Sequence, residues 1–311
     1  MKFVLSIFLV IFTQQFVFSQ GCSSAGFCTM GSLKANQSYS SVHKVKINYI
    51  ELSHLVANNG LGEVINASTL DASLSVGKRN RLQIRLPYAW VNGNFGQTKG
   101  FGDVYLAYSR NLLQKSTYSI DASIGTKFPR FTTALASPEG KPLPMYYSPS
   151  LGTYDIILGL SYLSEKWLLG IGYQAPLGKG DTDNFFDPKS WADTPLSEIA
   201  KNYDYSVNFK RGQDIMLRLE RNFRWGAYNL FVGAMPVYRI TSDEVVDEQG
   251  LKKEVKDSQG LALTGIMGGS YSLNVHNRIK LFYGHKILAR KVNVDGLMKE
   301  SVATIAYEWR F

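Results

Sequence analysis

Apolar and polar side chains alternate at every second position along much of this chain. In residues 81–90 the even positions are all apolar, while Arg81, Gln83 and Arg85 occupy odd positions between them. Because successive side chains of a β-strand point to opposite faces, such a segment has one apolar face and one charged face. A barrel that crosses a membrane needs this pattern, since its outer wall meets lipid while its lumen holds polar groups. The alternation therefore predicts an all-β fold, a transmembrane antiparallel β-barrel.

About twelve segments fit a strand pattern, and an even strand number suits a single-chain barrel. They are centred at Ile47, Leu74, Ile84, Leu106, Ala122, Leu158, Ile171, Leu217, Val232, Leu263, Leu281 and Tyr307. Short links at 78–80, 113–116, 165–166, 222–226 and 274–277 alternate with longer ones at 57–68, 92–100, 128–150, 178–202, 241–259 and 290–299. Outer-membrane barrels have short periplasmic turns and longer extracellular loops. We therefore expect this arrangement, with both termini on the periplasmic side.

The first residues have the order of a secretory signal peptide. Lys2 precedes an apolar run at 3–12, and the small Ser19 suits cleavage before Gln20. We predict a signal peptide at 1–19 and export to the cell outer membrane. A lipoprotein signal acylated at Cys22 is the alternative, although Ser19 stands where such signals usually carry Leu.

The segment between this signal and the first strand has no sustained period. Residues 20–42 are rich in Ser and Gly, so we expect a periplasmic arm ahead of a barrel at 43–311. Cys22 and Cys28 are disulfide candidates, because an exported chain meets an oxidising compartment. If the arm entered the lumen it would plug the channel, and the loop between the two cysteines would form a compact stopper.

The last residues place apolar side chains at every second position up to the C-terminus. They are Ile305, Tyr307, Trp309 and Phe311. This pattern is similar to the C-terminal signal strand by which the barrel-assembly machinery selects outer-membrane proteins. The expected partners are that machinery, outer-membrane lipid and lipopolysaccharide.

Composition and motifs argue against nucleic-acid binding, cofactors and catalysis. The formal charge is +9, but the basic residues are dispersed and form no basic run. The four histidines are scattered without a ligand spacing, so no cofactor is expected. An outer-membrane lipid hydrolase is a remote alternative, in which His285 would be the best base, but the chain lacks a Gly-x-Ser-x-Gly motif. We therefore expect a protein that is not an enzyme.

Clustered carboxylates at 181–187 give a weak calcium prediction. Asp181, Asp183 and Asp187 follow Gly180, and carboxylate oxygens with a flexible Gly suit calcium, but the full EF-hand pattern is absent. A solvated acidic loop or a lipopolysaccharide-bridging site explains the same residues.

The alternation also predicts which charged residues face the lumen. The candidates are Arg81, Arg85, Asp103, Asp121, Asp155, Asp214, Arg218, Glu220, Arg278, Lys280, Glu308 and Arg310. They could select solutes by charge and size, or pair across the lumen and fill it. Because both signs occur in similar numbers, no strong ion preference follows.

Two short motifs resemble a known family. Gly100-Phe101-Gly102-Asp103-Val104-Tyr105-Leu106 resembles the opening of a strand in outer-membrane transporters of the MetA phenol-degradation-pathway type, and residues 155–162 resemble a later strand of the same proteins. The resemblance implies a passive channel for small hydrophobic or aromatic compounds. The Gln after the signal and the strands rich in Tyr and Phe are similar to proteins of the Gram-negative Bacteroidetes.

Two of the predicted external loops suggest further possible roles. The loop at 128–147 is rich in Pro and aromatic residues, so it could fold inward as a constriction or an apolar ligand surface, or simply rigidify an exposed loop. The densely charged residues 243–257 would suit a structural, adhesion or receptor barrel that acts through its loops.

Overall fold

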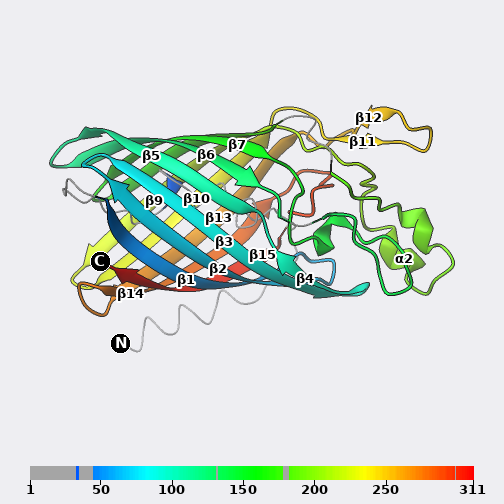
Figure 1. Ribbon diagram of the computed structural model, residues 1–311, viewed down its shortest axis with the longest axis horizontal. Helices are drawn as coiled ribbons and strands as arrows, with labels where there is room; N and C mark the ends of the chain where they lie inside the picture. The colour runs from blue at the N-terminus through cyan, green and yellow to red at the C-terminus, as the bar shows by residue number, and fades with distance from the viewer. Residues whose placement is uncertain (1–32, 35–44, 131, 178–181, 298) are drawn as a thin grey trace.

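The fold is a closed antiparallel barrel, which confirms the predicted class (Figure 1). The computed structural model describes residues 33–34, 45–130, 132–177, 182–297 and 299–311. Twelve strands form the barrel wall, and each of the twelve predicted centres lies in one of them. They are β1 (Lys46–Asn58), β2 (Val64–Val76), β3 (Asn80–Gly93), β5 (Val104–Gln114), β6 (Tyr118–Phe128), β7 (Asp155–Ser164), β8 (Trp167–Pro176), β9 (Asp214–Trp225), β10 (Tyr228–Arg239), β13 (Gly260–Ser272), β14 (Asn277–Leu288) and β15 (Ser301–Arg310).

The first and last strands close the barrel. β1 pairs antiparallel with β15, from Tyr49 opposite Arg310 to Asn58 opposite Ser301. Closure satisfies the backbone polar groups of both strands and leaves no open edge in the membrane. The C-terminal strand predicted as an assembly signal is therefore also the strand that completes the wall.

Short turns gather at one end of the barrel, hereafter the turn end, and longer connections at the other, the loop end. Some connections are shorter than predicted because their strands run further than expected. Residues 59–63 alone connect β1 to β2, and β3 pairs with β4 (Gly96–Phe101) up to Gly93 opposite Gly96. The turn between β9 and β10 lies at 226–227 rather than 222–226 and begins at Gly226, whose φ of 54° suits glycine.

The loop end carries the remaining short elements. They are η4 (Met145–Tyr147), η5 (Pro188–Trp191), α2 (Ser197–Ala200) and the hairpin of β11 (Glu244–Val246) with β12 (Lys252–Glu254). Of these, α2 and the β11–β12 hairpin lie beyond the strand ends (Figure 1). None of the helices in the described part of the chain is long and apolar enough to span a membrane.

An apolar belt covers the outer wall. Leu52, Ile171, Leu281 and Ile305 are between 47% and 57% exposed on four different strands. So much exposed apolar surface is stable only against lipid, as expected of a transmembrane barrel. At the turn end, Trp309 packs edge-to-face on Tyr307 with ring centroids 4.4 Å apart, which fits an aromatic girdle at a membrane interface.

Candidate functional site in the barrel lumen

The inward side chains of neighbouring strands form layers across the lumen. On β1 the inward row runs Glu51, Ser53, Leu55 and Ala57 from the turn end toward the loop end. These residues pair across to Asp71, Thr69, Ala67 and Ile65 of β2 and to Glu308, Ala306, Thr304 and Val302 of β15. At about 3.3 Å per residue the row covers roughly 20 Å. The wall therefore changes over this distance from charged to small polar to apolar.

Near the turn end, charged side chains of both signs alternate across the lumen in a turn-end ion cluster. Its members are Lys34, Glu51, Asp71, Arg85, Lys280, Glu308 and Arg310. Lys280 Nζ lies 2.7 Å from Glu51 Oε2 and also contacts Glu308. Arg310 Nε lies 2.6 Å from Glu308 Oε1. These pairs neutralise one another and link β1, β2, β3, β14 and β15.

One member of this cluster comes from outside the barrel wall. Lys34 Nζ lies 3.3 Å from Glu51 Oε1 and 3.1 Å from Asp71 Oδ2, and it donates to the Tyr49 hydroxyl at 3.0 Å. Leu33 is also buried, packed in a core cluster with inward residues of the strands. At these two residues, the segment before β1 therefore lies inside the barrel.

At the loop end, a second and more buried loop-end ion cluster surrounds Arg239. The Arg239 guanidinium is fully buried, with Nε 2.9 Å from Asp214 Oδ1, Nη1 2.7 Å from Asp243 Oδ1 and Nη2 2.8 Å from Asp295 Oδ2. Arg211 contacts Asp214 in the same cluster. Since Arg211, Asp243 and Asp295 belong to three different connections, the cluster fastens those loops to β9 and β10.

The pKa of Asp295, a loop carboxylate in this cluster, depends on the arginines around it. Burial would raise the pKa of Asp295, but the guanidinium groups of Arg239, Arg290 and Arg211 outweigh it and hold that pKa well below its usual range. Asp295 also accepts a hydrogen bond from the Leu297 backbone N–H at 3.1 Å. The carboxylate therefore stays charged at neutral pH and fixes the last loop before β15.

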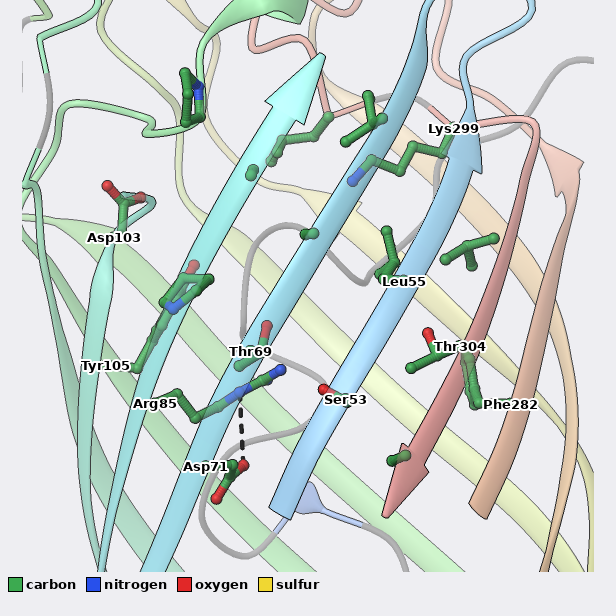
Figure 2. Close-up of a pocket in the computed structure, with 18 of the residues that line it drawn as sticks. Ser53, Leu55, Thr69, Asp71, Arg85, Asp103, Tyr105, Phe282, Lys299 and Thr304 are labelled. Atoms are coloured by element: carbon green, nitrogen blue, oxygen red, sulfur yellow. Dashed lines mark ion pairs between the residues drawn. The ribbon is translucent and has the colours of Figure 1, made fainter. Parts of the chain in front are cut away.

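A cavity of about 220 Å³ lies in the lumen, with part of each ion cluster in its lining (Figure 2). Apolar side chains form much of its wall: Leu55, Ile65, Ala67, Pro87, Ala89, Val91, Met145, Leu151, Phe231, Met235, Phe282, Leu297, Val302 and Ala306. Pockets for drug-sized ligands measure about 300–1,000 Å³, so this cavity suits a smaller molecule.

The loop at 128–147 was expected either to fold into the lumen or to stay exposed, and its described residues near η4 fold into the lumen. Met145 and Tyr146 of η4 line the cavity, and the Tyr146 hydroxyl donates to the Asn293 carbonyl at 3.2 Å. The next residue, Tyr147, is fully buried and packs edge-to-face on Phe95 with centroids 5.9 Å apart. The loop thus narrows the lumen and contributes apolar surface to the cavity.

All twelve charged residues predicted for the lumen have buried or half-buried side chains. They do not gather in a single site. Eight are buried, and Arg85, Arg278, Lys280 and Arg310 are partly buried. Arg218 Nε bonds Glu220 at 2.6 Å, Asp121 accepts from Asn111 at 2.6 Å, and Arg278 bonds Ser272 at 3.2 Å. Those that line the cavity are Arg85, Asp103, Arg218 and Lys280.

Sequence reasoning missed several charged residues of the lumen. Glu51, Asp71, Lys127 and Arg239 share the inward phase of their strands, so extending the same alternation would have found them. Four others lie in connections, where no period exists to signal them: Arg211, Asp243, Arg290 and Asp295.

The calcium candidates do not form a metal site among the residues that the structure describes. Asp183 accepts the Thr133 backbone N–H at 2.7 Å and the hydroxyls of Thr132 and Thr133. Asp187 caps η5 by accepting from the Lys189 N–H at 2.9 Å. In the described ranges no group of three or more His, Cys, Asp or Glu side chains could hold a metal. Asp181, Cys22 and Cys28, like the predicted signal peptide, lie outside those ranges.

Two histidines, His54 and His285, lie on the outer wall, where a lipid hydrolase would place its base. His285 is exposed on the outer wall and stacks on Tyr283 with centroids 6.4 Å apart. His54, also on the outer wall, has Nδ1 3.1 Å from Ser68 Oγ. Nucleophilic catalysis also needs a group that orients the base and donors for the oxyanion. Among the described residues, no carboxylate or amide side chain bonds His54.

Comparisons with known proteins extend this picture. No protein-family model and no curated protein matches the chain. An outer membrane channel from Pseudomonas putida F1 is 14% identical, with a TM-score of 0.58 over 89% of this chain and 98% of that one. The NanC porin is 9% identical, with a TM-score of 0.47 over 86% and 100% of the two chains. Outer membrane phospholipase A from Escherichia coli is 11% identical, with a TM-score of 0.36 over 94% and 98%. The likeness to the Pseudomonas channel shows that the chain has the fold of an outer-membrane β-barrel.

Proposed function

We propose that the protein is a passive outer-membrane channel for small apolar or aromatic solutes. The observation that carries this proposal is the apolar cavity of about 220 Å³ in the lumen. A site for a small ligand typically combines an apolar wall with a few polar groups that orient the ligand. Here the wall offers Leu55, Phe282 and Val302, and the polar groups include Ser53 and Thr69.

The state of the lumen charges supports the same class of solute. Channels for hydrophilic solutes or ions use water-filled lumens and rings of charge. In this barrel, the charged side chains at both ends largely pair with one another and fasten strands to loops. Paired charges attract ions weakly, whereas the apolar middle of the lumen favours partition of an apolar ring.

The test is single-channel current of the refolded mature protein in a planar bilayer. Benzyl alcohol and the neutral sugar arabinose are added separately, and a block of the current reports a solute that enters the lumen. We expect block by benzyl alcohol and none by arabinose. Passage or block by arabinose while benzyl alcohol leaves the current unchanged would overturn the proposal, as would a folded barrel whose current neither solute alters.

A further inference from the structure

Lys299 is a buried cation at the loop end of the cavity. It lies in the connection between β14 and β15, is 4% exposed and lines the cavity (Figure 2). Its ammonium forms no hydrogen bond or ion pair within 4.0 Å with any residue in the described part of the chain. Burial lowers the pKa of Lys299 to about 8, and no neighbouring carboxylate raises it. At neutral pH the side chain is therefore mostly charged.

Two carboxylates that line the same cavity, Asp295 and Asp103, already have partners. Asp295 bonds Arg239 at 2.8 Å and the Leu297 N–H at 3.1 Å. Asp103 lies 3.3 Å from Lys127 Nζ and accepts the Leu151 N–H at 3.1 Å. Neither carboxylate needs Lys299, so neither explains why a lysine is buried here.

A buried charge without a partner is costly, and such groups gather at functional sites. A lysine that only had to fill space could be replaced by an apolar residue at a gain in stability. The cavity beside Lys299 instead gives the ammonium room to meet a solute. Its position therefore favours a role in binding.

The shape of the cavity defines that solute further. Figure 2 shows Lys299 at one end, the ion pair of Arg85 with Asp71 toward the other, and Leu55 between them. Arg85 and Lys280 are each paired with carboxylates, so Lys299 supplies one positive charge next to an apolar wall. One cation suits one carboxylate rather than a multiply charged solute.

We propose that the cavity binds small apolar monoanions, aromatic or short aliphatic carboxylic acids, with the carboxylate on Lys299 Nζ and the apolar body against Leu55, Phe282 and Val302. This inference rests on the channel function proposed above and names its substrate class. The ammonium donates to the carboxylate, and the ring or chain fills the apolar half of the cavity.

The test compares benzoate with benzamide, which has nearly the same shape and no charge. Dissociation constants come from block of the single-channel current at pH 7. Benzoate should bind on the order of tenfold more tightly than benzamide, as expected for one charged hydrogen bond. Lys299→Met should remove this difference and leave benzamide unchanged, whereas Lys299→Arg should retain most of it.

The control is Lys291→Met in the same connection, because the Lys291 side chain is 82% exposed. It removes the same charge from the loop and should leave the preference for benzoate intact. Heat-modifiable migration on gels verifies folding, and Lys299→Gln replaces Lys299→Met if the latter fails to fold.

Two outcomes separate this inference from the proposed function. The acid-binding proposal fails if the wild-type protein binds benzamide as tightly as benzoate, or if Lys299→Met still binds benzoate more tightly than benzamide. Either result leaves the proposed channel function for aromatic solutes unaffected. If neither aromatic compound binds, the channel function fails together with its substrate class.

Discussion

Lys34 precedes the first strand, yet its ammonium lies 3.1 Å from a carboxylate oxygen of Asp71 in the middle of β2. A residue outside the barrel wall thus completes the turn-end ion cluster. Asp71 also accepts from Gln83 at 2.8 Å and lies 3.6 Å from Arg85 Nε. The contact joins the segment before β1 to charges on β2 and β3, where it occupies part of the lumen.

Removing that segment should open the channel. We expect deletion of residues 21–41 from the mature protein to raise single-channel conductance, because Leu33 and Lys34 then no longer occupy the lumen. Lys34→Ala should give a smaller rise, and Lys78→Ala, at an exposed turn position, should give none. Unchanged conductance after the deletion would show that the predicted arm does not act as a plug.

Arg239→Met should loosen the loop end. Removing this guanidinium leaves Asp214, Asp243 and Asp295 without their shared partner, and breaking a buried ion pair costs about 3–5 kcal/mol. The free energy of unfolding in urea should fall by this order, and a protease added to folded vesicles should cut the connections at 177–213 and 289–300 faster. Arg79→Met, at an exposed turn position, serves as the control. Equal stability of the two variants would contradict the role given to Arg239.

The sequence predicted the barrel because a strand's register is specified by its alternation. A slip of one residue would turn Glu51, Asp71 and Arg239 outward into lipid. Only one register therefore keeps the charged side chains in the lumen. The strand ends were less certain, because outside the membrane no apolar belt is needed. β1 and β2 therefore extend into residues 57–68, which the sequence predicted to be a loop.

The loop part of the site could not be found in the same way. Lys299 sits between Leu297 and Glu300 in a stretch without a period, and nothing local shows that it will be buried. The same connection is held at Asp295, which pairs with Arg239 in the loop-end ion cluster. Such long-range contacts appear only when the chain has folded.

Binding of an acid in the cavity should depend on pH through Lys299. Its pKa is about 8, so the ammonium is present below that pH and is lost as the pH rises through it. Affinity for benzoate should therefore fall between pH 7 and pH 10, while affinity for benzamide should not. Bound benzoate favours the charged form, so the midpoint should lie above that of the empty protein.

Lys299→Arg tests whether this titration belongs to Lys299. An arginine keeps its charge throughout the range, so benzoate affinity should become independent of pH. Other ionisable side chains also line the cavity: Lys34, Glu51, Asp71, Arg85, Asp103, Tyr105, Tyr146, Arg218, Lys280 and Asp295. If the fall persists in Lys299→Arg, one of these groups governs it instead.

The apolar wall should set affinity for neutral aromatic solutes. Val302 is 3% exposed and faces the cavity, so Val302→Thr introduces a hydroxyl there at almost unchanged volume. Burying a hydroxyl without a full set of partners costs about 1–3 kcal/mol, so benzyl alcohol should block the current at a concentration at least roughly fivefold higher. Val232→Thr makes the same change on the outer wall, where the side chain is 50% exposed, and should leave the block unchanged. Equal effects of the two substitutions would mean that aromatic solutes act from the lipid rather than from the lumen.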